Sequence, residues 1–139
     1  MSGYLLDTNV VSEARKGRRT DANVQAWLDS IEDKELFLSV LVLGEIRKEI
    51  EQAGSQDSVK ARALERWLAG LERTHGDRVL PITIAIADQW GRLSAIRPIN
   101  SVDGLLAATA LVYDMTFVTR NVAHVEHTGV RVLNPFDQQ

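Results

Sequence analysis

The sequence has no cysteine among its 139 residues. This absence excludes a disulfide framework and any zinc site built on thiolates, and it fits the reducing environment of the cytoplasm. The three histidines, His75, His124 and His127, show no zinc-site spacing either. Any metal bound by this chain is therefore expected to use oxygen ligands.

Long apolar runs and a strong net charge are also absent. No segment approaches the roughly 18 uncharged apolar residues that span a bilayer, and the N-terminus lacks the basic region of a signal peptide and reaches Asp7 after two leucines. A net charge of −3 argues against a protein that coats nucleic acid by electrostatics alone, although it leaves room for a nuclease. We expect one cytoplasmic domain over residues 1–139, without membrane contact.

Short apolar runs alternate with helical periodicities along the chain. Strands are predicted at Leu5-Leu6 and over residues 36–39, 79–82, 115–119 and 130–133. Helices are predicted over residues 10–15, after a cap at Thr20 or Asp21, over 40–52 and 58–75, around Trp90, and over 101–113 with Ser101 as the cap. Strands that alternate with helices predict an α/β fold with a mainly parallel sheet covered on both faces.

Three acidic residues lie where a strand passes into a helix or where a helix has just begun. Asp7 follows the first strand, Glu45 lies about one turn into its helix, and Asp103 lies in the first turn of another. Ligands of open parallel sheets bind beyond the carboxyl ends of the strands, and a buried carboxylate is costly unless it is paired or binds a cation. The three together predict a divalent metal site. Taken singly, Asp7 and Asp103 also fit helix caps or helix dipoles, and Glu45 a solvated side chain.

A fourth polar residue, Asn121, follows the strand that ends near Val118 and is a candidate to complete this site. Oxygen ligands suit Mg²⁺ or Mn²⁺, and the reaction typical of such a site is hydrolysis of a phosphodiester by a metal-activated water. Four further residues are candidates to support the ligands or contact a phosphate, and each also fits an ordinary cap or turn: Thr8, Ser39, Thr119 and Arg120.

Two other features bear on partners. The basic run over residues 15–19 suits contact with an RNA backbone, or is a solvated loop. Apolar stripes that contain Trp67, Leu68 and Leu71, or Ile86, Trp90 and Leu93, offer more apolar surface than a small sheet requires, so we expect a homodimer.

The motifs in this order resemble those of the PIN-domain ribonucleases, in particular the VapC/FitB-like toxins of type II toxin–antitoxin systems. The resemblance covers essentially the whole chain. The matching segments are Leu5-Leu6-Asp7-Thr8-Asn9-Val10, the stretch from Ser39 to Ile46, residues 103–110, Val118-Thr119-Arg120-Asn121 and residues 129–136. No single motif is specific, but five in order are strong evidence.

The resemblance implies a three-layer α/β/α sandwich and a Mg²⁺- or Mn²⁺-dependent endoribonuclease that hydrolyses RNA. It also implies a homodimer and a small antitoxin encoded beside the toxin, whose tail blocks the acidic pocket. Asp7, Glu45 and Asp103 carry over as metal ligands and catalytic residues. At the fourth position this chain has Asn121 where some relatives have Asp, and His124 stands where many have an acid.

Two alternatives remain at the level of sequence. Phosphatases of the haloacid dehalogenase type also begin with Asp after an apolar strand, but they need a second acid two residues later, where this chain has Asn9. A non-catalytic PIN-like binding module is the other alternative, and the intact Asp7, Glu45 and Asp103 argue against it.

Overall fold

A five-stranded parallel sheet forms the centre of the computed structural model, which describes residues 3–138. The strands lie in the order β3-β2-β1-β4-β5. Their bounds are Tyr4–Leu6 (β1), Leu36–Ser39 (β2), Val79–Leu80 (β3), Thr116–Val118 (β4) and Val132–Leu133 (β5). Because the chain leaves β1 toward β2 on one side and returns as β4 on the other, the sheet has its topological switch point between β1 and β4, where ligands of such sheets bind.

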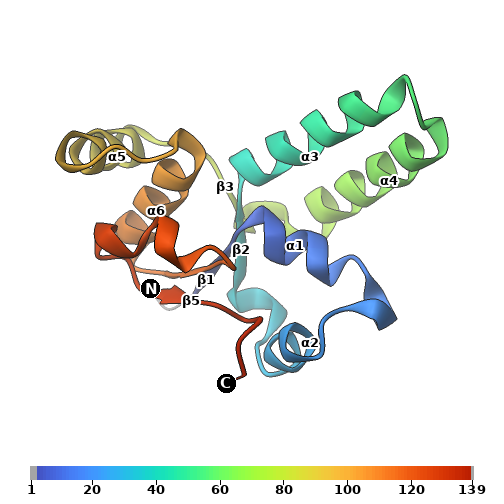
Figure 1. Cartoon of the computed structure of the whole chain (residues 1–139), viewed down its shortest axis with the longest axis horizontal. Helices are drawn as coiled ribbons and strands as arrows, with labels where there is room; N and C mark the ends of the chain where they lie inside the picture. The colour runs from blue at the N-terminus through green and yellow to red at the C-terminus, as the bar shows by residue number, and fades with distance from the viewer. Residues whose placement is uncertain (1–2, 139) are drawn as a thin grey trace.

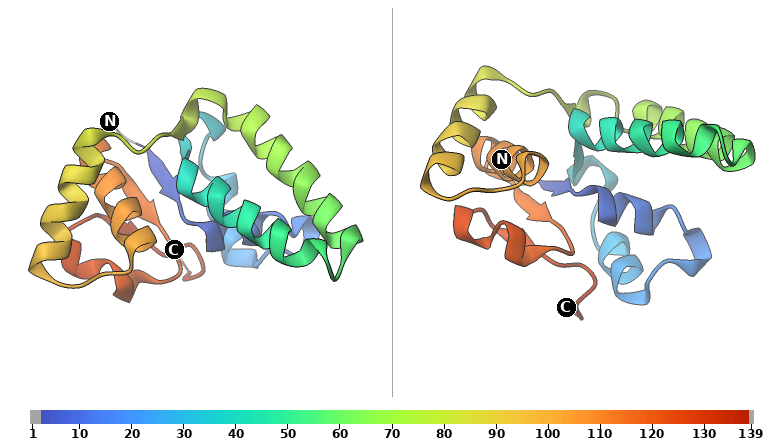
Figure 2. Two further views of the ribbon diagram at one scale, coloured as in Figure 1. Left: turned by 90° about the horizontal axis from the view of Figure 1, so that it is seen from above. Right: turned by 45° about the horizontal axis from the view of Figure 1, so that its top comes forward.

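Helices pack around this sheet in the α/β/α arrangement that the sequence predicts, so the fold class is confirmed (Figure 1). Their bounds are Thr8–Ala14 (α1), Ala22–Asp29 (α2), Val40–Gly54 (α3), Ser58–His75 (α4), Ile84–Ile96 (α5) and Ser101–Tyr113 (α6). Helices α3 and α4 form an antiparallel arm that projects from one side, and α5 and α6 pair on the other (Figures 1 and 2). None of the helices within residues 3–138 combines the length and apolar character needed to cross a bilayer.

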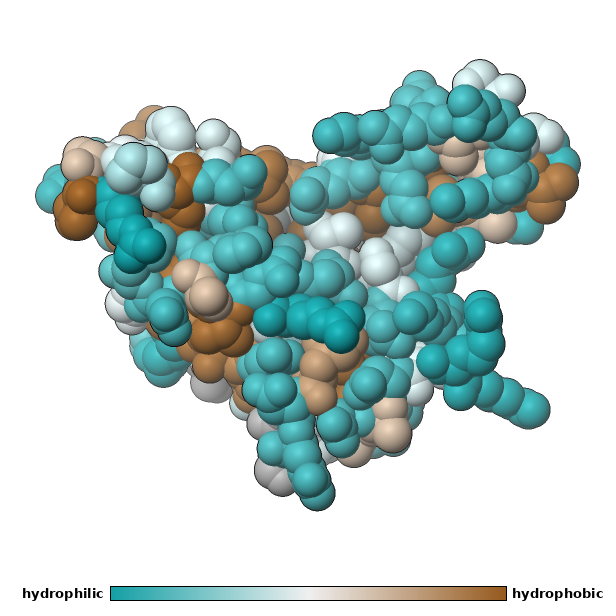
Figure 3. All heavy atoms as spheres, in the orientation of Figure 1, coloured by the Kyte–Doolittle hydropathy of each residue, from teal (hydrophilic) through white to brown (hydrophobic). Residues whose placement is uncertain are grey.

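The core is made of side chains from the sheet and from the inner faces of the helices. Leu5, Leu38 and Phe117 are almost fully buried in the strands, and Ile46 and Leu106 cover them from α3 and α6. Burial of one such side chain stabilises the fold by roughly 1.5–3 kcal/mol. The outer surface is mainly hydrophilic in the view of Figure 3.

Several predicted boundaries differ from the structure. Helix α1 begins at Thr8 rather than residue 10, because Asp7 accepts the Thr8 N–H and caps the helix. Helix α3 continues to Gly54 rather than ending at residue 52. Strand β3 ends at Leu80 rather than residue 82, because its partner β2 ends at Ser39 and Pro81 has no N–H to donate. Strands β4 and β5 are likewise shorter than predicted.

The predicted cap of α6 is wrong by one residue. Asn100, not Ser101, precedes the helix, and its Oδ1 accepts the N–H groups of Val102 at 3.0 Å and Asp103 at 3.3 Å. The second helix, in contrast, begins after Asp21, one of the two caps considered. Both side chains fix the direction in which a helix begins, and in α6 this places Asp103 in the first turn.

The apolar stripes behind the homodimer prediction have another use in this structure. Leu68, Ile86 and Leu93 are buried in the core, so they are not available as a subunit interface. Trp67 and Leu71 line a groove on the chain's own surface. Homodimerisation stays a prediction, and of the residues behind it Leu68, Ile86 and Leu93 can take no part in an interface.

Candidate metal centre

The most buried acidic side chain of the site is Asp7, which stands at the carboxyl end of β1 with 6% of its surface exposed. Its backbone N–H donates to the Val118 carbonyl at 2.9 Å, so the end of β1 is joined to the end of β4. Its Oδ1 accepts the Thr8 N–H at 2.8 Å, and its Oδ2 accepts the Thr119 hydroxyl at 2.8 Å. The carboxylate is thereby fixed in one orientation.

Asn9 adds a clamp that the sequence reading missed. Its amide nitrogen lies 3.3 Å from Asp7 Oδ2 and 3.4 Å from Thr119 Oγ1, and its carbonyl oxygen accepts the Arg120 N–H at 3.2 Å. The one side chain thus joins the start of α1 to the segment after β4. In the sequence Asn9 looked only like a residue that favours the start of a helix, and the one local signal for its role is that it lies two residues after Asp7.

Two further carboxylates face Asp7. Burial raises the pKa of Asp7 above its ordinary value, hydrogen bonds from Thr119 and Thr8 oppose the rise, and the negative charges of Asp103 and Glu45 add to it. The Asp103 and Glu45 carboxylates are close enough to Asp7 to raise its pKa, and three like charges at one place favour a cation; we refer to these three side chains as the acidic pocket. The structure therefore brings together the three acids that the sequence singled out from three separate segments.

Glu45 and Asp103 are each held by a neighbour. The Thr8 hydroxyl donates to Glu45 Oε1, which links α1 to α3, and both helices begin near the middle of the molecule (Figure 1). His124 Nδ1 lies 3.4 Å from Asp103 Oδ2.

Gly104 is needed beside Asp103, because a Cβ at this position would lie 2.9 Å from Trp90 Cδ1 and 3.0 Å from Ile99 Cγ2. The missing side chain lets α5 and α6 approach closely.

The remaining predicted site residues, Ser39, Asn121 and Arg120, make other contacts. Ser39 is fully buried and caps α3 by accepting the Leu41 N–H at 3.1 Å. Asn121 donates its backbone N–H to Thr119 Oγ1 at 3.0 Å, while its side chain is exposed. The Arg120 guanidinium lies 4.3 Å from the centre of the Phe136 ring. The roles of these residues as ligands or phosphate contacts stay predictions.

The donor set fits a hard divalent cation. Within residues 3–138, no group of three or more His, Asp or Glu side chains is arranged to hold a metal ion by itself. Mg²⁺, however, commonly takes only one or two carboxylates and completes its shell with water and substrate phosphates. A fixed, desolvated Asp7 with two more carboxylates facing it satisfies that requirement, and all of the donors are oxygen atoms.

Comparisons with known proteins agree with this geometry. The family model described as PIN domain matches residues 4–129. The chain is 31% identical to the VapC ribonuclease Y4jK of Sinorhizobium fredii, over 96% of this chain and 97% of that protein. It is 30% identical to Toxin FitB of Neisseria gonorrhoeae, over 95% and 97%.

A solved structure extends the likeness to three dimensions. The crystal structure of FitAcB from Neisseria gonorrhoeae matches with a TM-score of 0.85 at 28% identity and covers 96% of this chain and 98% of that one. The PIN fold excludes the haloacid dehalogenase alternative. The chain belongs to the PIN domain family, among its VapC- and FitB-like members.

Proposed function

We propose that this protein is a metal-dependent endoribonuclease that acts on cytoplasmic RNA as the toxin of a toxin–antitoxin pair. The observation that carries the proposal is the buried, oriented Asp7 carboxylate with Glu45 and Asp103 facing it at the switch point of the sheet. The relatives named ribonuclease and toxin support the assignment. Asp7, Glu45 and Asp103 would hold Mg²⁺ or Mn²⁺, with Asn121 as a fourth, neutral ligand.

Each residue contributes a defined task in this proposal. When bound, the cation would lower the pKa of a water molecule and stabilise the oxygen that leaves phosphorus. Thr119, Asn9 and the Thr8 N–H hold the Asp7 carboxylate in one orientation, and the Thr8 hydroxyl holds Glu45. Support of this kind matters because ligands held by a network lose less freedom when the cation binds.

Removal of the metal provides the direct test. Purified protein incubated with single-stranded RNA should cleave it in the presence of Mg²⁺ or Mn²⁺, stop when EDTA is added, and resume when excess metal is restored. Gel analysis of end-labelled RNA measures this. Cleavage that continues at an undiminished rate in EDTA would contradict the proposal, and a protein that binds RNA without cutting it under any condition would be the non-catalytic module.

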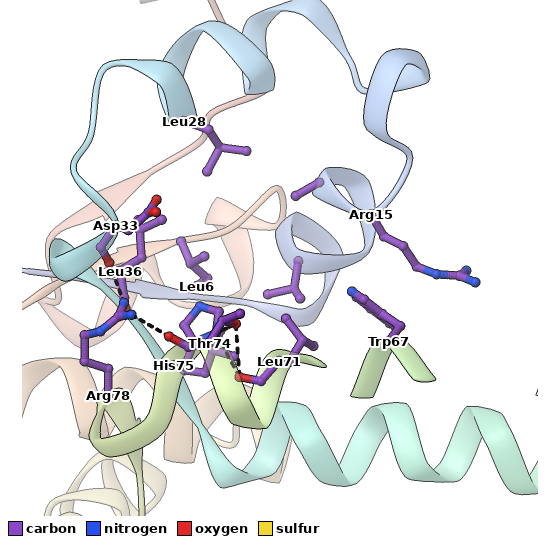
Figure 4. Close-up of a pocket in the computed structure, with 13 residues that line it drawn as sticks. Leu6, Arg15, Leu28, Asp33, Leu36, Trp67, Leu71, Thr74, His75 and Arg78 are labelled. Atoms are coloured by element: carbon purple, nitrogen blue, oxygen red, sulfur yellow. Dashed lines mark hydrogen bonds between the residues drawn. The ribbon is translucent and has the colours of Figure 1, made fainter. Parts of the chain in front are cut away.

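A second proposal concerns the antitoxin. An apolar groove of about 290 Å³ lies between α1, α2, α4 and β2 (Figure 4). Its apolar lining includes Leu6, Val11, Leu28, Leu36, Trp67 and Leu71. The Arg15 guanidinium stands 5.2 Å from the Trp67 ring at one end, and Arg78 and Asp33 lie at the other. An apolar groove with charged ends suits an amphipathic segment, and we propose that the antitoxin places such a segment here.

The fourth position allows a quantitative prediction. An amide oxygen can bind Mg²⁺ but adds no charge, so Asn121→Asp is expected to tighten Mg²⁺ binding, by about threefold to tenfold if one more carboxylate contributes roughly 1 kcal/mol. Asn121→Ala should weaken cleavage less than a change at Asp7. Calorimetric titration of Mg²⁺ measures the affinities, and identical values in the wild type and both variants would remove Asn121 from the site.

A further inference from the structure

A second hollow, of about 360 Å³, adjoins the acidic pocket at Asp103. It lies between the turn that joins α5 to α6 and the two 3₁₀ turns after β4, Val122–His124 and Glu126–Thr128, which pass beside α6 (Figures 1 and 2). The residues that line it are Arg97, Pro98, Ile99, Asn100, Asp103, Ala123, His124 and His127. Because Asp103 belongs to both, a ligand in the hollow would lie directly beside the metal centre.

Apart from Asp103, the polar side chains that line this hollow are one arginine, one asparagine and two histidines. The exposed Arg97 guanidinium has no hydrogen bond or ion pair in the part of the chain that the structure describes. His124 keeps 58% of its side chain exposed while its Nδ1 approaches Asp103. An unpaired guanidinium in the same hollow as Asp103 offers a contact for the phosphate of a polyanion.

His127 contributes a ring surface to the hollow. Both of its ring nitrogens are buried and have no hydrogen-bond partner within residues 3–138, and the residue is one of those that line the hollow. Pro98 and Ile99 provide apolar surface next to it. Asn100 uses its Oδ1 to cap α6, which leaves its amide N–H groups as donors. Stacking surface combined with a few donors is how proteins bind an unpaired base.

We infer that this hollow is a nucleotide subsite for single-stranded RNA, which holds the nucleotide beside the scissile phosphate. Arg97 and His124 contact its phosphate, and the base stacks on His127 with Asn100 donating to its edge. The inference rests on the proposed nuclease function and deepens it, because it assigns substrate preference to residues outside the metal centre.

Binding without catalysis tests the phosphate contact. In an Asp7→Asn background and in EDTA, fluorescence anisotropy of a labelled single-stranded RNA should show that Arg97→Ala weakens binding by about fivefold or more and reduces the salt dependence by close to one phosphate contact. Arg62→Ala is the matched control, because Arg62 is an exposed arginine on α4 and its loss changes the net charge equally. Equal effects of the two changes would overturn the subsite.

Cleavage of a random-sequence RNA pool tests the base contact. His127→Ala should relax the base preference at one position next to the cut, and His127→Phe, which keeps a ring, should retain a preference there. An unchanged preference profile in folded His127→Ala would overturn the inference, as would an Arg97→Ala variant that binds the antitoxin more weakly but RNA normally. Failure of the wild type to bind or cleave RNA at all would instead refute the nuclease proposal itself.

Discussion

Replacement of Asp7 by Asn is expected to reduce metal-dependent RNA cleavage by at least about 100-fold while the protein remains folded. Loss of a partner that merely supports a ligand already costs 10- to 100-fold in metal-site function, and Asn at this position removes the ligand charge itself. The shape of the side chain is preserved, its Oδ1 can still accept the Thr8 N–H, and the Thr119 hydroxyl can rotate to accept from the new Nδ2. Rates measured on one RNA at saturating Mn²⁺, with circular dichroism as the check on folding, give the result.

Although Asp7→Asn should lower activity, it should not lower the stability of the metal-free protein and should raise it slightly. Because the pKa of Asp7 is raised in the folded state, the folded protein binds this proton more tightly than the unfolded chain does. The free energy of unfolding therefore falls as pH rises from the ordinary pKa of 3.8 through the raised value, and it stays lower at neutral pH. In EDTA at pH 7, Asp7→Asn should unfold at or slightly above the Tm of the wild type, and this advantage should shrink toward pH 3.

A matched control separates this effect from a general change of charge. Asp88 is exposed and pairs with Arg92 at 3.0 Å, away from the acidic pocket. Asp88→Asn should cleave RNA like the wild type and should gain no stability in EDTA. Full chelator-sensitive cleavage by Asp7→Asn would show that Asp7 is not a metal ligand.

Apolar runs and helical stripes in the sequence predicted the strands and helices whose formation depends on neighbouring residues. The Leu36–Ser39 strand and the Ser58–His75 helix follow from a short apolar run and a long apolar stripe, and both have the predicted bounds. Asp7 and Asp103 stand where a strand or a loop passes into a helix, and parallel strands place such positions at one edge of the sheet. Sequence alone therefore predicted that Asp7 and Asp103 lie near each other, whereas their role as metal ligands stays a prediction.

Contacts between segments far apart in the sequence could not be predicted from local patterns. Asn9 and Thr119 are 110 residues apart, and only the adjacency of β1 and β4 makes them partners around Asp7. The apolar stripe of a helix likewise does not reveal whether it contacts the core or lines an open groove. Leu68 packs into the core while Trp67 and Leu71 border an open groove, so a surface that looked like a dimer interface proved to be a candidate binding groove.

The groove leads to the second large effect. Leu71→Asp is expected to weaken binding of the antitoxin by about 30-fold or more, since loss of a central apolar contact in an interface commonly costs 2 kcal/mol or more and an unpaired carboxylate would have to be desolvated on binding. RNA cleavage by the free variant should stay close to normal, because Leu71 lies in the groove rather than in the acidic pocket. The ligand is the cognate antitoxin that the resemblance implies, and calorimetry measures its affinity.

Two more variants make this result specific. Leu28→Asp introduces the same charge from α2, across the groove, and should weaken antitoxin binding in the same direction. Val59→Asp places the same negative charge on α4, at a side chain that is 68% exposed and lies outside the groove. It should have little effect on antitoxin binding. Light scattering provides the decisive comparison, because it distinguishes antitoxin binding from subunit association at the groove. If Leu71→Asp and Leu28→Asp lower the oligomer mass of the free protein and leave antitoxin affinity unchanged, the groove joins two copies of this chain, whereas a loss of antitoxin affinity at unchanged mass assigns it to the antitoxin.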